Sequence, residues 1–454
     1  MQILNQLGEI VWGLPMILIL ILVGFYLSLK TNFAQIMHLG HILKSTIFKI
    51  GKRDNKEGIS PFKAMATALA GSAGTGNIVG VATAIALGGP GAIFWMWVSG
   101  FLGMMTKTAE VTLALKFREK SPGGVYKGGP MYYIKNGLGR KFMPLAIVFS
   151  IAAMGASLGV GNVTQINSLS VGLNDSFNIP LLLSGITAAI ITALVIFKGI
   201  KSIANFAGTL VPFMSIFYVL GALVVIFINR ENLLSAFLSI FSGAFGLAEI
   251  GGGIAGFTFS RAVRFGISRG VFTNEAGMGS SPIAHSAAKC DNPVKQGMWG
   301  ALEVFIDTIV VCTITALVIL SSGVLADSSI EGYALTSAAF EQALGVYGSY
   351  FIAIALTLFG IATIIGWSHY GSVACDFLTK DNKTAQNLYK SAYVIMIIIG
   401  AIMPVTAVWS LADILNGFMA LPNLIALALL SPIACKLINE YFKHERYLLS
   451  KSQR

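Results

Sequence analysis

Apolar stretches of close to twenty residues recur along almost the whole chain of 454 residues. About 20 helical residues cross the hydrocarbon core of a bilayer, whereas a membrane strand needs only about ten alternating residues. Charged residues make up 11% of the sequence, and soluble domains contain roughly 25%. The sequence therefore predicts an all-α membrane protein, a helical bundle whose outer surface contacts lipid.

Eleven membrane-spanning segments are expected. They cover residues 10–29, 62–87, 92–117, 142–173, 181–197, 204–228, 258–288, 300–323, 351–377, 392–408 and 411–441. The stretch 237–288 is long enough for two crossings, but two would place the basic C-terminal tail outside the cell. We therefore expect 237–256 to be re-entrant or to lie in the outer interface, although Arg261, Arg264 and Arg269 then fall in the outer half of the seventh span.

The positive charge is unevenly distributed among the loops. Seven Lys and Arg residues lie in 30–63, seven in 116–141 and five in 436–454. Cytoplasmic loops carry such an excess, so these loops and the C-terminus are expected in the cytoplasm and the N-terminus outside. The net charge of +11 thus reflects topology in a prokaryotic cell membrane, and we expect no binding of nucleic acid.

Two similar glycine-rich motifs interrupt the second and the seventh spans. Ala-Gly-Thr-Gly-Asn begins at residue 73, and Ala-Gly-Met-Gly-Ser begins at residue 276. Five spans separate equivalent positions, so the second half should run with inverted topology. Interrupted helices at matching places in two inverted halves indicate the central binding site of a transporter. Close packing of unbroken helices is the alternative explanation of such glycines.

This repeat defines the expected organisation of the chain. Residues 1–59 form an extra N-terminal helix and a basic linker, 60–230 the first repeat, 231–443 the second repeat, and 444–454 a cytoplasmic tail.

A break in the second span would expose main-chain groups in the membrane, where they must line a cavity or meet protein partners. Carbonyl groups at the end of its first half would face a cation or an ammonium group. Amides at the start of its second half suit a carboxylate, because the N-terminus of a helix carries partial positive charge. The carbonyls belong to Ala70, Ser72 and Ala73, and the amide region consists of Gly74, Thr75, Gly76 and Asn77. A small zwitterion matches this arrangement, because its ammonium group can meet the carbonyls and its carboxylate can meet the amides.

Several side chains complete the predicted site. Oxygen ligands for Na⁺ are available from Asn77, Thr75, Thr273 and Thr363. Phe272, Met278 and Trp367 are candidates for the walls of a very small pocket, although apolar side chains in such a chain commonly contact lipid or the core. Gln165 is an amide that lipid would disfavour, so it is expected to face substrate or a polar network.

Ionisable residues inside spans are also functional candidates. They are Glu110, Glu249, Glu275, Glu303, Asp307, His285 and His369. Glu275 adjoins the second glycine motif, where it either ligates a cation or holds the broken backbone. Asp307 has either a network role or a coupling role.

Longer motifs resemble the sodium:alanine/glycine symporter family. The most specific is GGPGAIFWMW at 88–97, followed by Gly100 and Gly103. Others are GTGNIVGVATA at 74–84, GGPMYYI at 128–134, GVFTNEAGMGSSPIA at 270–284, DTIVVCTITAL at 307–317 and GWSHYG at 366–371. The resemblance covers about residues 60–430.

The resemblance implies a fold of five-plus-five inverted repeats of the leucine-transporter type, with one extra N-terminal helix. It also implies Na⁺-coupled uptake of alanine or glycine by alternating access. In that fold the region equivalent to Gly74–Gly76 meets the substrate carboxylate, and the residue equivalent to Asn77 ligates sodium. Phe272-Thr273 matches the pair before the second break, where the Thr contributes to the sodium site.

Three further residues match family positions that face the substrate, namely Gln165, Thr363 and Trp367. The second sodium site of the wider fold uses adjacent hydroxyl residues on the eighth core helix. Here only Thr363 stands in the corresponding stretch, LFGIATIIGW.

A proton-coupled amino-acid permease of the same fold is the main alternative, with Glu275 or Asp307 as proton carrier. An ion channel or a membrane enzyme is disfavoured because we find neither a pore-loop sequence nor a cluster of catalytic type in the sequence. The choice between alanine and glycine, the number of Na⁺ ions and the oligomeric state stay open at this stage.

Overall fold

The computed structural model describes residues 12–50, 58–121, 123–246, 253–326 and 332–452. This part of the chain is almost entirely helical. Its first helices are α2 (Leu14–Lys30), α3 (Ala34–Met37), α4 (Leu39–Ser45), α5 (Pro61–Ser72), α6 (Val79–Gly88), α7 (Ala92–Lys116), α8 (Pro130–Tyr133), α9 (Met143–Leu158), α10 (Thr164–Phe177), α11 (Leu181–Ile196) and α12 (Ile200–Ile228). The later ones are α13 (Leu233–Ala244), α14 (Gly253–Asn274), α15 (Ser281–His285), α16 (Pro293–Val304), α17 (Thr313–Ser322), α18 (Tyr333–Leu344), α19 (Val346–Thr379), α20 (Lys383–Ile402) and α21 (Val405–Ser452).

Shorter elements connect or interrupt these helices. Segments of 3-10 helix are η1 (Ile47–Lys49), η2 (Thr75–Asn77), η4 (Arg140–Phe142), η6 (Arg230–Asn232) and η9 (Val324–Ala326). Segments of π-helix are η3 (Ile134–Leu138), η5 (Gly159–Val163) and η8 (Phe305–Cys312). Strands β1 (Glu119–Lys120) and β2 (Tyr126–Lys127) form an antiparallel hairpin in which Glu119 lies opposite Lys127.

Six helical stretches in the described residues are long and apolar enough to cross a membrane. They are Arg140–Phe177, Ile200–Ile228, Pro293–Ser322, Val346–Thr379, Lys383–Ile402 and Ile414–Glu445. Pro15–Lys30, Val79–Gly88 and Leu181–Ile196 are shorter apolar helices. Each of the eleven expected segments contains a helix, which confirms the helical membrane class; the number of crossings and the inverted repeat stay predictions.

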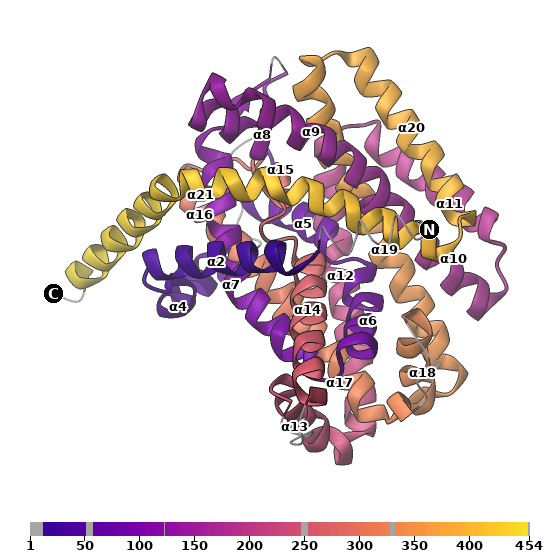
Figure 1. Cartoon of the computed structure of the whole chain (residues 1–454). Helices are drawn as coiled ribbons and strands as arrows, with labels where there is room; N and C mark the ends of the chain where they lie inside the picture. The colour runs from indigo at the N-terminus through magenta and orange to yellow at the C-terminus, as the bar shows by residue number, and fades with distance from the viewer. Residues whose placement is uncertain (1–11, 51–57, 122, 247–252, 327–331, 453–454) are drawn as a thin grey trace.

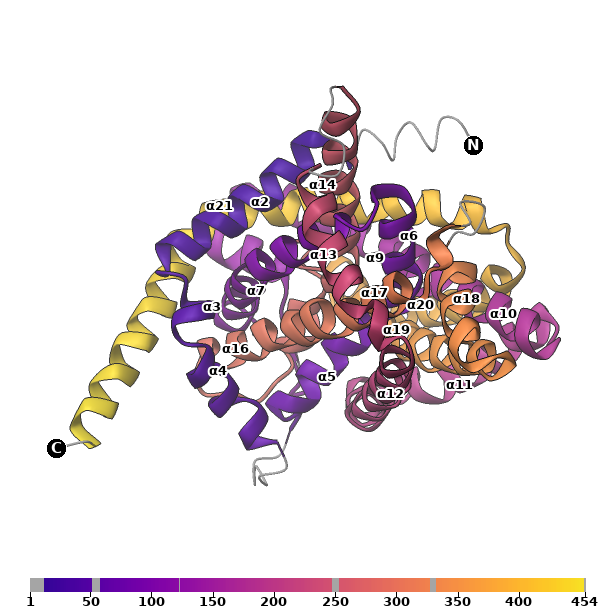
Figure 2. The ribbon, with the colours of Figure 1, turned by 90° about the horizontal axis from the view of Figure 1, so that it is seen from below.

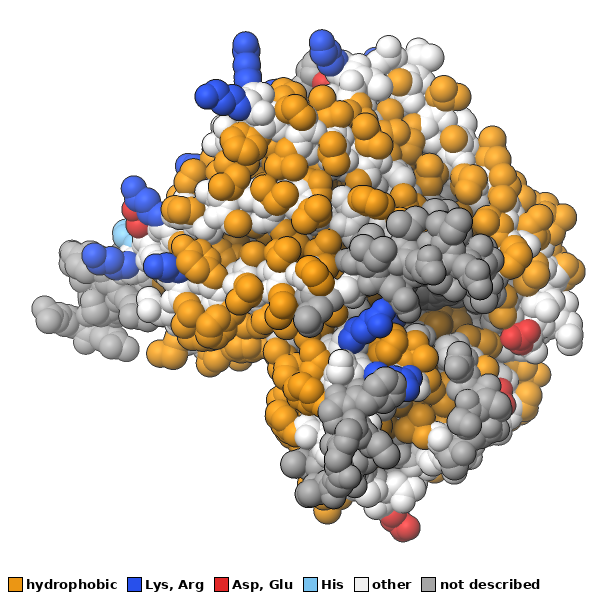
Figure 3. Space-filling model, viewed as in Figure 1, with side chains coloured by type: hydrophobic (Ala, Val, Ile, Leu, Met, Phe, Trp, Pro, Cys, Tyr) orange, Lys and Arg blue, Asp and Glu red, His pale blue; other side chains and the backbone are white. Residues whose placement is uncertain are grey.

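The surface is that of a protein embedded in lipid. Large apolar side chains are exposed on many outer helices, among them Leu194 at 62% and Phe227 at 68%. Figure 3 shows hydrophobic side chains over much of one face, with Lys and Arg side chains along its top and left edges and a few near its centre. Because charged groups avoid hydrocarbon, this separation is expected where the apolar region faces the bilayer.

The broken helix α5–α6 lies inside the bundle. Figures 1 and 2 show α5 among its neighbours, and α5 packs against α12, α15 and α19. Helix α14 packs against α6 and α7, and α7 also packs along α16. Helices α2 and α21 lie side by side at one edge and contact α7, so the extra N-terminal helix is peripheral.

Three expectations about element boundaries were wrong. The tenth span was expected at 392–408, but α20 runs from Lys383 to Ile402. It begins early because the Asn382 side chain accepts hydrogen bonds from the amides of Thr384 and Ala385, which caps a polar first half. It ends early because Met403 precedes Pro404 and is extended, with ψ 150°.

The other two concern segments that were read as connections. The stretch 323–348 contains α18, and the basic linker 30–63 contains α3 and α4. Both were missed because these helices are too short or too polar to look like spans. The expected re-entrant stretch 237–256 includes the end of α13, while its residues 247–252, with Glu249, lie outside the described residues.

Candidate binding site between two broken helices

The first break separates α5 from α6 and confirms that the second span is interrupted. Ser60 caps α5, Pro61 occupies its first turn, and the helix ends at Ser72. Ala73 has φ −75° and ψ 80°, and Gly74 has φ −122° and ψ −152°, so neither continues the helix. A single 3-10 turn, η2, then leads to α6.

Gly74 is required here by the space around it. A Cβ atom on Gly74 would lie 2.6 Å from Thr363 Oγ1 and 2.9 Å from Gln165 Oε1. Both side chains therefore touch the backbone of the break, and any larger residue would displace them.

The second break follows Asn274, the last residue of α14, and is likewise confirmed. Gly277 and Gly279 have φ angles of 87° and 81°, which glycine adopts without strain. Glu275 has φ 54°, which is uncommon for a residue with a side chain. The chain resumes as the five-residue helix α15 at Ser281.

The two breaks adjoin each other. A Cβ atom on Gly76 would lie 3.0 Å from Thr273 Cγ2 and 3.2 Å from Phe272 Cδ1. The predicted Phe-Thr pair of the second interrupted helix thus contacts the glycine motif of the first. Met278 is fully buried in the apolar cluster that also contains Phe272 and Trp367.

Helices α10 and α19 bring three predicted residues to the first break. Gln165 Oε1 accepts a hydrogen bond from the Thr75 amide at 3.0 Å. The Thr363 hydroxyl donates to the Ala70 carbonyl at 2.9 Å, and Trp367 Nε1 donates to the Gly71 carbonyl at 3.2 Å. The main-chain groups released by the break are therefore held by side chains from neighbouring helices, as membrane burial requires.

Two buried oxygen atoms at the first break have no hydrogen-bond partner among the described residues. They are Thr75 Oγ1 and Asn77 Oδ1, and both residues are 0% exposed. Asn77 Nδ2 is satisfied, because it donates to Asp307 Oδ1 at 2.8 Å. Buried polar atoms are nearly always paired, so two unpaired oxygens in one place favour a site for a cation or a hydrogen-bond donor.

The remaining predicted sodium ligands lie around the same break. The Ser72 carbonyl accepts from the Gly74 amide at 2.9 Å, and the Ser72 hydroxyl donates to Glu303 at 3.3 Å. Thr273 Oγ1 donates to the Gly270 carbonyl at 2.9 Å. Each of these oxygens keeps a lone pair after its hydrogen bond, so further coordination is open to it.

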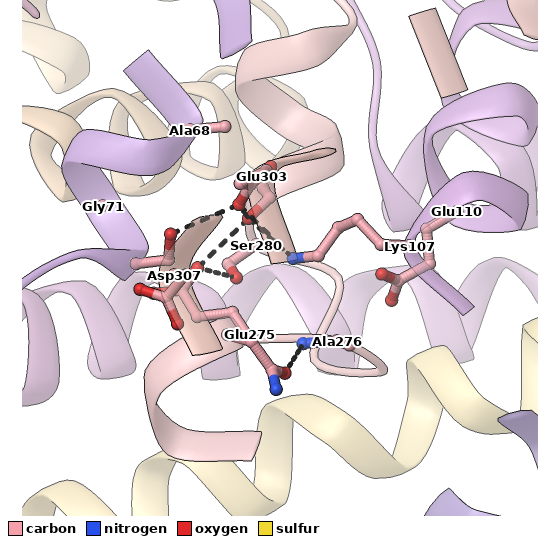
Figure 4. A network of polar contacts seen from close by, with 12 residues as sticks. Ala68, Gly71, Lys107, Glu110, Glu275, Ala276, Ser280, Glu303 and Asp307 are labelled. Atoms are coloured by element: carbon pink, nitrogen blue, oxygen red, sulfur yellow. Dashed lines mark hydrogen bonds and ion pairs between the residues drawn. The ribbon is translucent and has the colours of Figure 1, made fainter. Parts of the chain in front are cut away.

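A buried ionic network joins the two breaks (Figure 4). Lys107 extends from α7 and donates to the Ser281 hydroxyl at 2.8 Å, with its Nζ 3.7 Å from Glu303 Oε1. Ser281 also donates to Glu303 at 2.8 Å, and Ser72 reaches the same carboxylate. Glu303 on α16 therefore contacts both the end of α5 and the start of α15.

Glu275 and His285 belong to this network. Glu275 Oε2 accepts from Ser280 at 2.5 Å and from Ser281 at 3.4 Å, so it bridges the second break. His285 is paired on both ring nitrogens, with Glu303 at 2.8 Å and Gln296 at 2.8 Å. Of the two roles considered for Glu275, these contacts match holding the broken segment.

Glu110 anchors the other side of the second break. Its Oε1 accepts from the Gly279 amide at 3.1 Å and from Asn423 Nδ2 at 2.6 Å. Asn423 also donates to the Gly277 carbonyl at 2.8 Å and accepts from the Tyr133 hydroxyl. Glu110 Oε2 is buried without a hydrogen-bond partner in the described part of the chain.

Sequence reasoning missed Lys107, which was absent from the ionisable candidates. Its signal was present, because Lys107 lies in the interior of the third span, three residues before Glu110. A lysine at that depth is costly unless it is paired inside the protein. The structure shows it 0% exposed, with Glu303 also 0% exposed.

Comparisons with known proteins identify relatives along the whole chain. The profile of the sodium:alanine symporter family matches residues 1–453. The chain is 42% identical to the sodium/alanine symporter AgcS of Methanococcus maripaludis over 452 residues, which is 98% of each protein. It is 37% identical over 457 residues to the putative sodium/proton-dependent alanine carrier protein YrbD of Bacillus subtilis, covering 97% of this chain and 92% of that one.

Among solved structures, MhsT in complex with L-phenylalanine matches 84% of this chain and 99% of its own, with a TM-score of 0.57 and 14% sequence identity. At that identity the likeness shows the fold alone, which is of the leucine-transporter type. A full-length family match and relatives at this identity leave one conclusion: the chain belongs to the sodium:alanine symporter family.

Proposed function

We propose that this protein is a Na⁺-coupled symporter that imports alanine or glycine by alternating access. The observation that carries the proposal is the contact between two broken helices in the buried interior, where side chains before the second break touch the glycine motif of the first. Opposed half-helix ends present both signs of partial charge, which suits a zwitterion. Membership in a transporter family implies that the protein is not an enzyme.

The substrate carboxylate is assigned to the amides of Thr75 to Asn77. Gln165 Oε1 now accepts from the Thr75 amide, so a carboxylate oxygen would replace or share that acceptor. The substrate must be small, because Gly74 and Gly76 are already in close contact with their neighbours. We assign the apolar walls to Trp367, Phe272 and Met278, which would favour a side chain no larger than a methyl group.

Sodium is assigned to the oxygens beside this amide region. Thr75 Oγ1 and Asn77 Oδ1 are buried without a hydrogen-bond partner among the described residues. Carbonyls of Ala70, Ser72 and Ala73 and the hydroxyls of Thr273 and Thr363 complete the oxygen donors. The name of the M. maripaludis relative, a sodium/alanine symporter, supports the same ion and substrate.

The decisive experiment is uptake of radiolabelled alanine into proteoliposomes with and without an inward Na⁺ gradient. Uptake by the unmodified protein should require Na⁺, and Asn77→Ala should abolish the Na⁺-driven component. Asn205→Ala, on the exposed side of α12, is the matched control and should behave as the unmodified protein. Na⁺-independent uptake would contradict the coupling ion, and full uptake by Asn77→Ala would remove Asn77 from the ion site.

Proton coupling is the second candidate, favoured by the buried carboxyl groups of Glu275, Asp307 and Glu110 near the breaks. The B. subtilis relative is named sodium/proton-dependent. In Na⁺-free buffer, an inward proton gradient would then drive alanine uptake. Glu275→Gln and Asp307→Asn should each remove this uptake. A purely Na⁺-coupled protein would show no proton-driven alanine uptake in Na⁺-free buffer even before mutation.

The topology forms part of the proposal. We place the N-terminus outside and the C-terminus in the cytoplasm, with eleven crossings in a multi-pass protein of a prokaryotic cell membrane. The two inverted repeats comprise 60–230 and 231–443, preceded by the extra helix and linker of 1–59 and followed by the tail 444–454. The basic loops support this orientation.

A further inference from the structure

A basic cavity of about 240 Å³ lies among the loops, away from the two breaks. Its walls come from residues 58–59 before α5, from 120 and 123–126 of the β-hairpin, from 200–201 at the start of α12, and from 287 and 289 after α15. Lys120, Lys201 and Lys289 line it. Among its lining residues that the structure describes, none is Asp or Glu.

The charge of this cavity favours an anion. The three lysines come from three separate segments, and all three residues are exposed. Ile200 and Lys201 form the first turn of α12, a helix of 29 residues, which adds partial positive charge to the same wall. Several cations around one concave space bind a phosphate more strongly than scattered surface lysines do.

The neighbouring surface distinguishes a lipid from a soluble anion. Phe197, which directly follows α11, is 48% exposed, and Leu194 on α11 is 62% exposed. Both belong to an apolar surface that we expect to face lipid. A phospholipid whose phosphate group binds beside Lys201 would therefore have its acyl chains next to an apolar helix. A free phosphate ion gains nothing from that surface.

We propose that this cavity binds the phosphate group of an anionic phospholipid from the leaflet that it faces. Under the proposed topology all four walls are cytoplasmic, so the lipid belongs to the inner leaflet. Phosphatidylglycerol has the required chemistry, with one negative charge and a compact headgroup.

The site has a consequence for the conformation of the protein, because its walls flank both broken helices. The Lys289 amide donates to the Ile59 carbonyl at 2.8 Å, and Ile59 forms a parallel bridge with Ala288. Arg118 donates to the carbonyls of Ser286 at 2.9 Å and Ala288 at 2.6 Å. A phosphate held by Lys120, Lys201 and Lys289 would fasten these segments together and stabilise the arrangement seen here.

The test measures thermal unfolding of the full-length protein in detergent micelles with added phosphatidylglycerol, phosphatidylcholine or inorganic phosphate. The triple variant Lys120→Gln, Lys201→Gln, Lys289→Gln is compared with a control triple variant, Lys141→Gln, Lys383→Gln, Lys443→Gln, whose lysines are exposed elsewhere. A third variant replaces the pocket lysines by Arg and keeps their charge. Binding of a fluorescent phosphatidylglycerol is titrated in parallel.

Phosphatidylglycerol should raise the unfolding temperature of the unmodified, control and Arg proteins, and phosphatidylcholine should not. Each pocket lysine removed should weaken lipid binding about fivefold. Equal losses in both Gln triple variants would show general surface attraction and overturn the site. Stabilisation by inorganic phosphate to the same extent would overturn the lipid as its source, and no effect of phosphatidylglycerol would overturn binding altogether.

Discussion

At the scale of single residues, the Lys107–Glu303 pair is the feature with the largest expected effect. Both side chains are 0% exposed, and their charged groups are 3.7 Å apart. Removing two charges from water is expensive, so such a pair contributes little net stability but becomes strongly destabilising when one partner is lost. Here it also fixes Ser281 and Ser72, which belong to the two breaks.

Lys107→Met should lower the free energy of unfolding by about 3–5 kcal/mol, because Glu303 would keep a buried charge without its lysine. Adding Glu303→Gln should recover part of this loss, since it removes the remaining charge and keeps an acceptor for Ser281. Thermal unfolding in detergent measures both. Lys116→Met, at the exposed end of the same helix, is the control and should unfold like the unmodified protein; an equally mild effect of Lys107→Met would contradict this account.

Gln165 offers a test of the proposed carboxylate position. Its Oε1 lies 3.0 Å from the Thr75 amide nitrogen. Gln165→Glu places a negative charge where the substrate carboxylate should bind, so the apparent KM for alanine should rise roughly tenfold or more. Initial uptake rates over a range of alanine concentrations measure this. Gln342→Glu, at an exposed residue of α18, should leave KM unchanged, and an unchanged KM for Gln165→Glu would move the carboxylate elsewhere.

At the scale of elements, departures from regular α-helix coincide with the site. The π-helical segment η5 includes Gly161, where an added Cβ would lie 2.1 Å from Trp367 Cγ. The π-helical segment η8 carries Asp307, which contacts Asn77. Because π-helical segments widen a helix and reorient its side chains, they are frequent at functional sites.

Gly161→Ala should therefore displace Trp367 and break its hydrogen bond to the Gly71 carbonyl. We expect a loss of about 1–3 kcal/mol in stability from overpacking, together with a clear reduction in alanine uptake. Gly80→Ala is the control, because its Cβ would find its nearest neighbour at 3.9 Å. Unchanged unfolding temperature and uptake in Gly161→Ala would show that Trp367 is not held by this contact.

At the scale of the whole molecule, the orientation in the membrane is open to direct measurement. Asn178 follows α10, and Asp381 connects α19 to α20. In a background without native cysteines, Asn178→Cys should react with an impermeant maleimide in intact cells. Asp381→Cys should react only after permeabilisation. The opposite labelling pattern would invert the proposed topology, and labelling of both sites in intact cells would contradict the number of spans between them.

The main features of the fold could be predicted because they depend on local properties of the chain. Apolar length indicated the helical spans, and glycine identity indicated the breaks at 73–77 and 276–280. Glycine permits close approach of side chains to the backbone at the first break and positive φ angles at the second. The limits of α20 and the presence of α18 could not be predicted from hydropathy. Capping by Asn382 and the packing of a short helix hardly change the mean hydropathy of a segment.

Most residues that lie at the two breaks were named from the sequence, with Lys107 as an exception, but the contacts between them were not. The sequence by itself determined an all-helical membrane protein with two interrupted helices, since length, polarity and glycine content act locally. Only the tertiary structure decided that Gln165 caps the Thr75 amide, that Lys107 joins Glu303, and that Glu275 bridges its own break. These pairings depend on how distant helices pack, and the energy that selects them arises only when their polar groups leave lipid and water together.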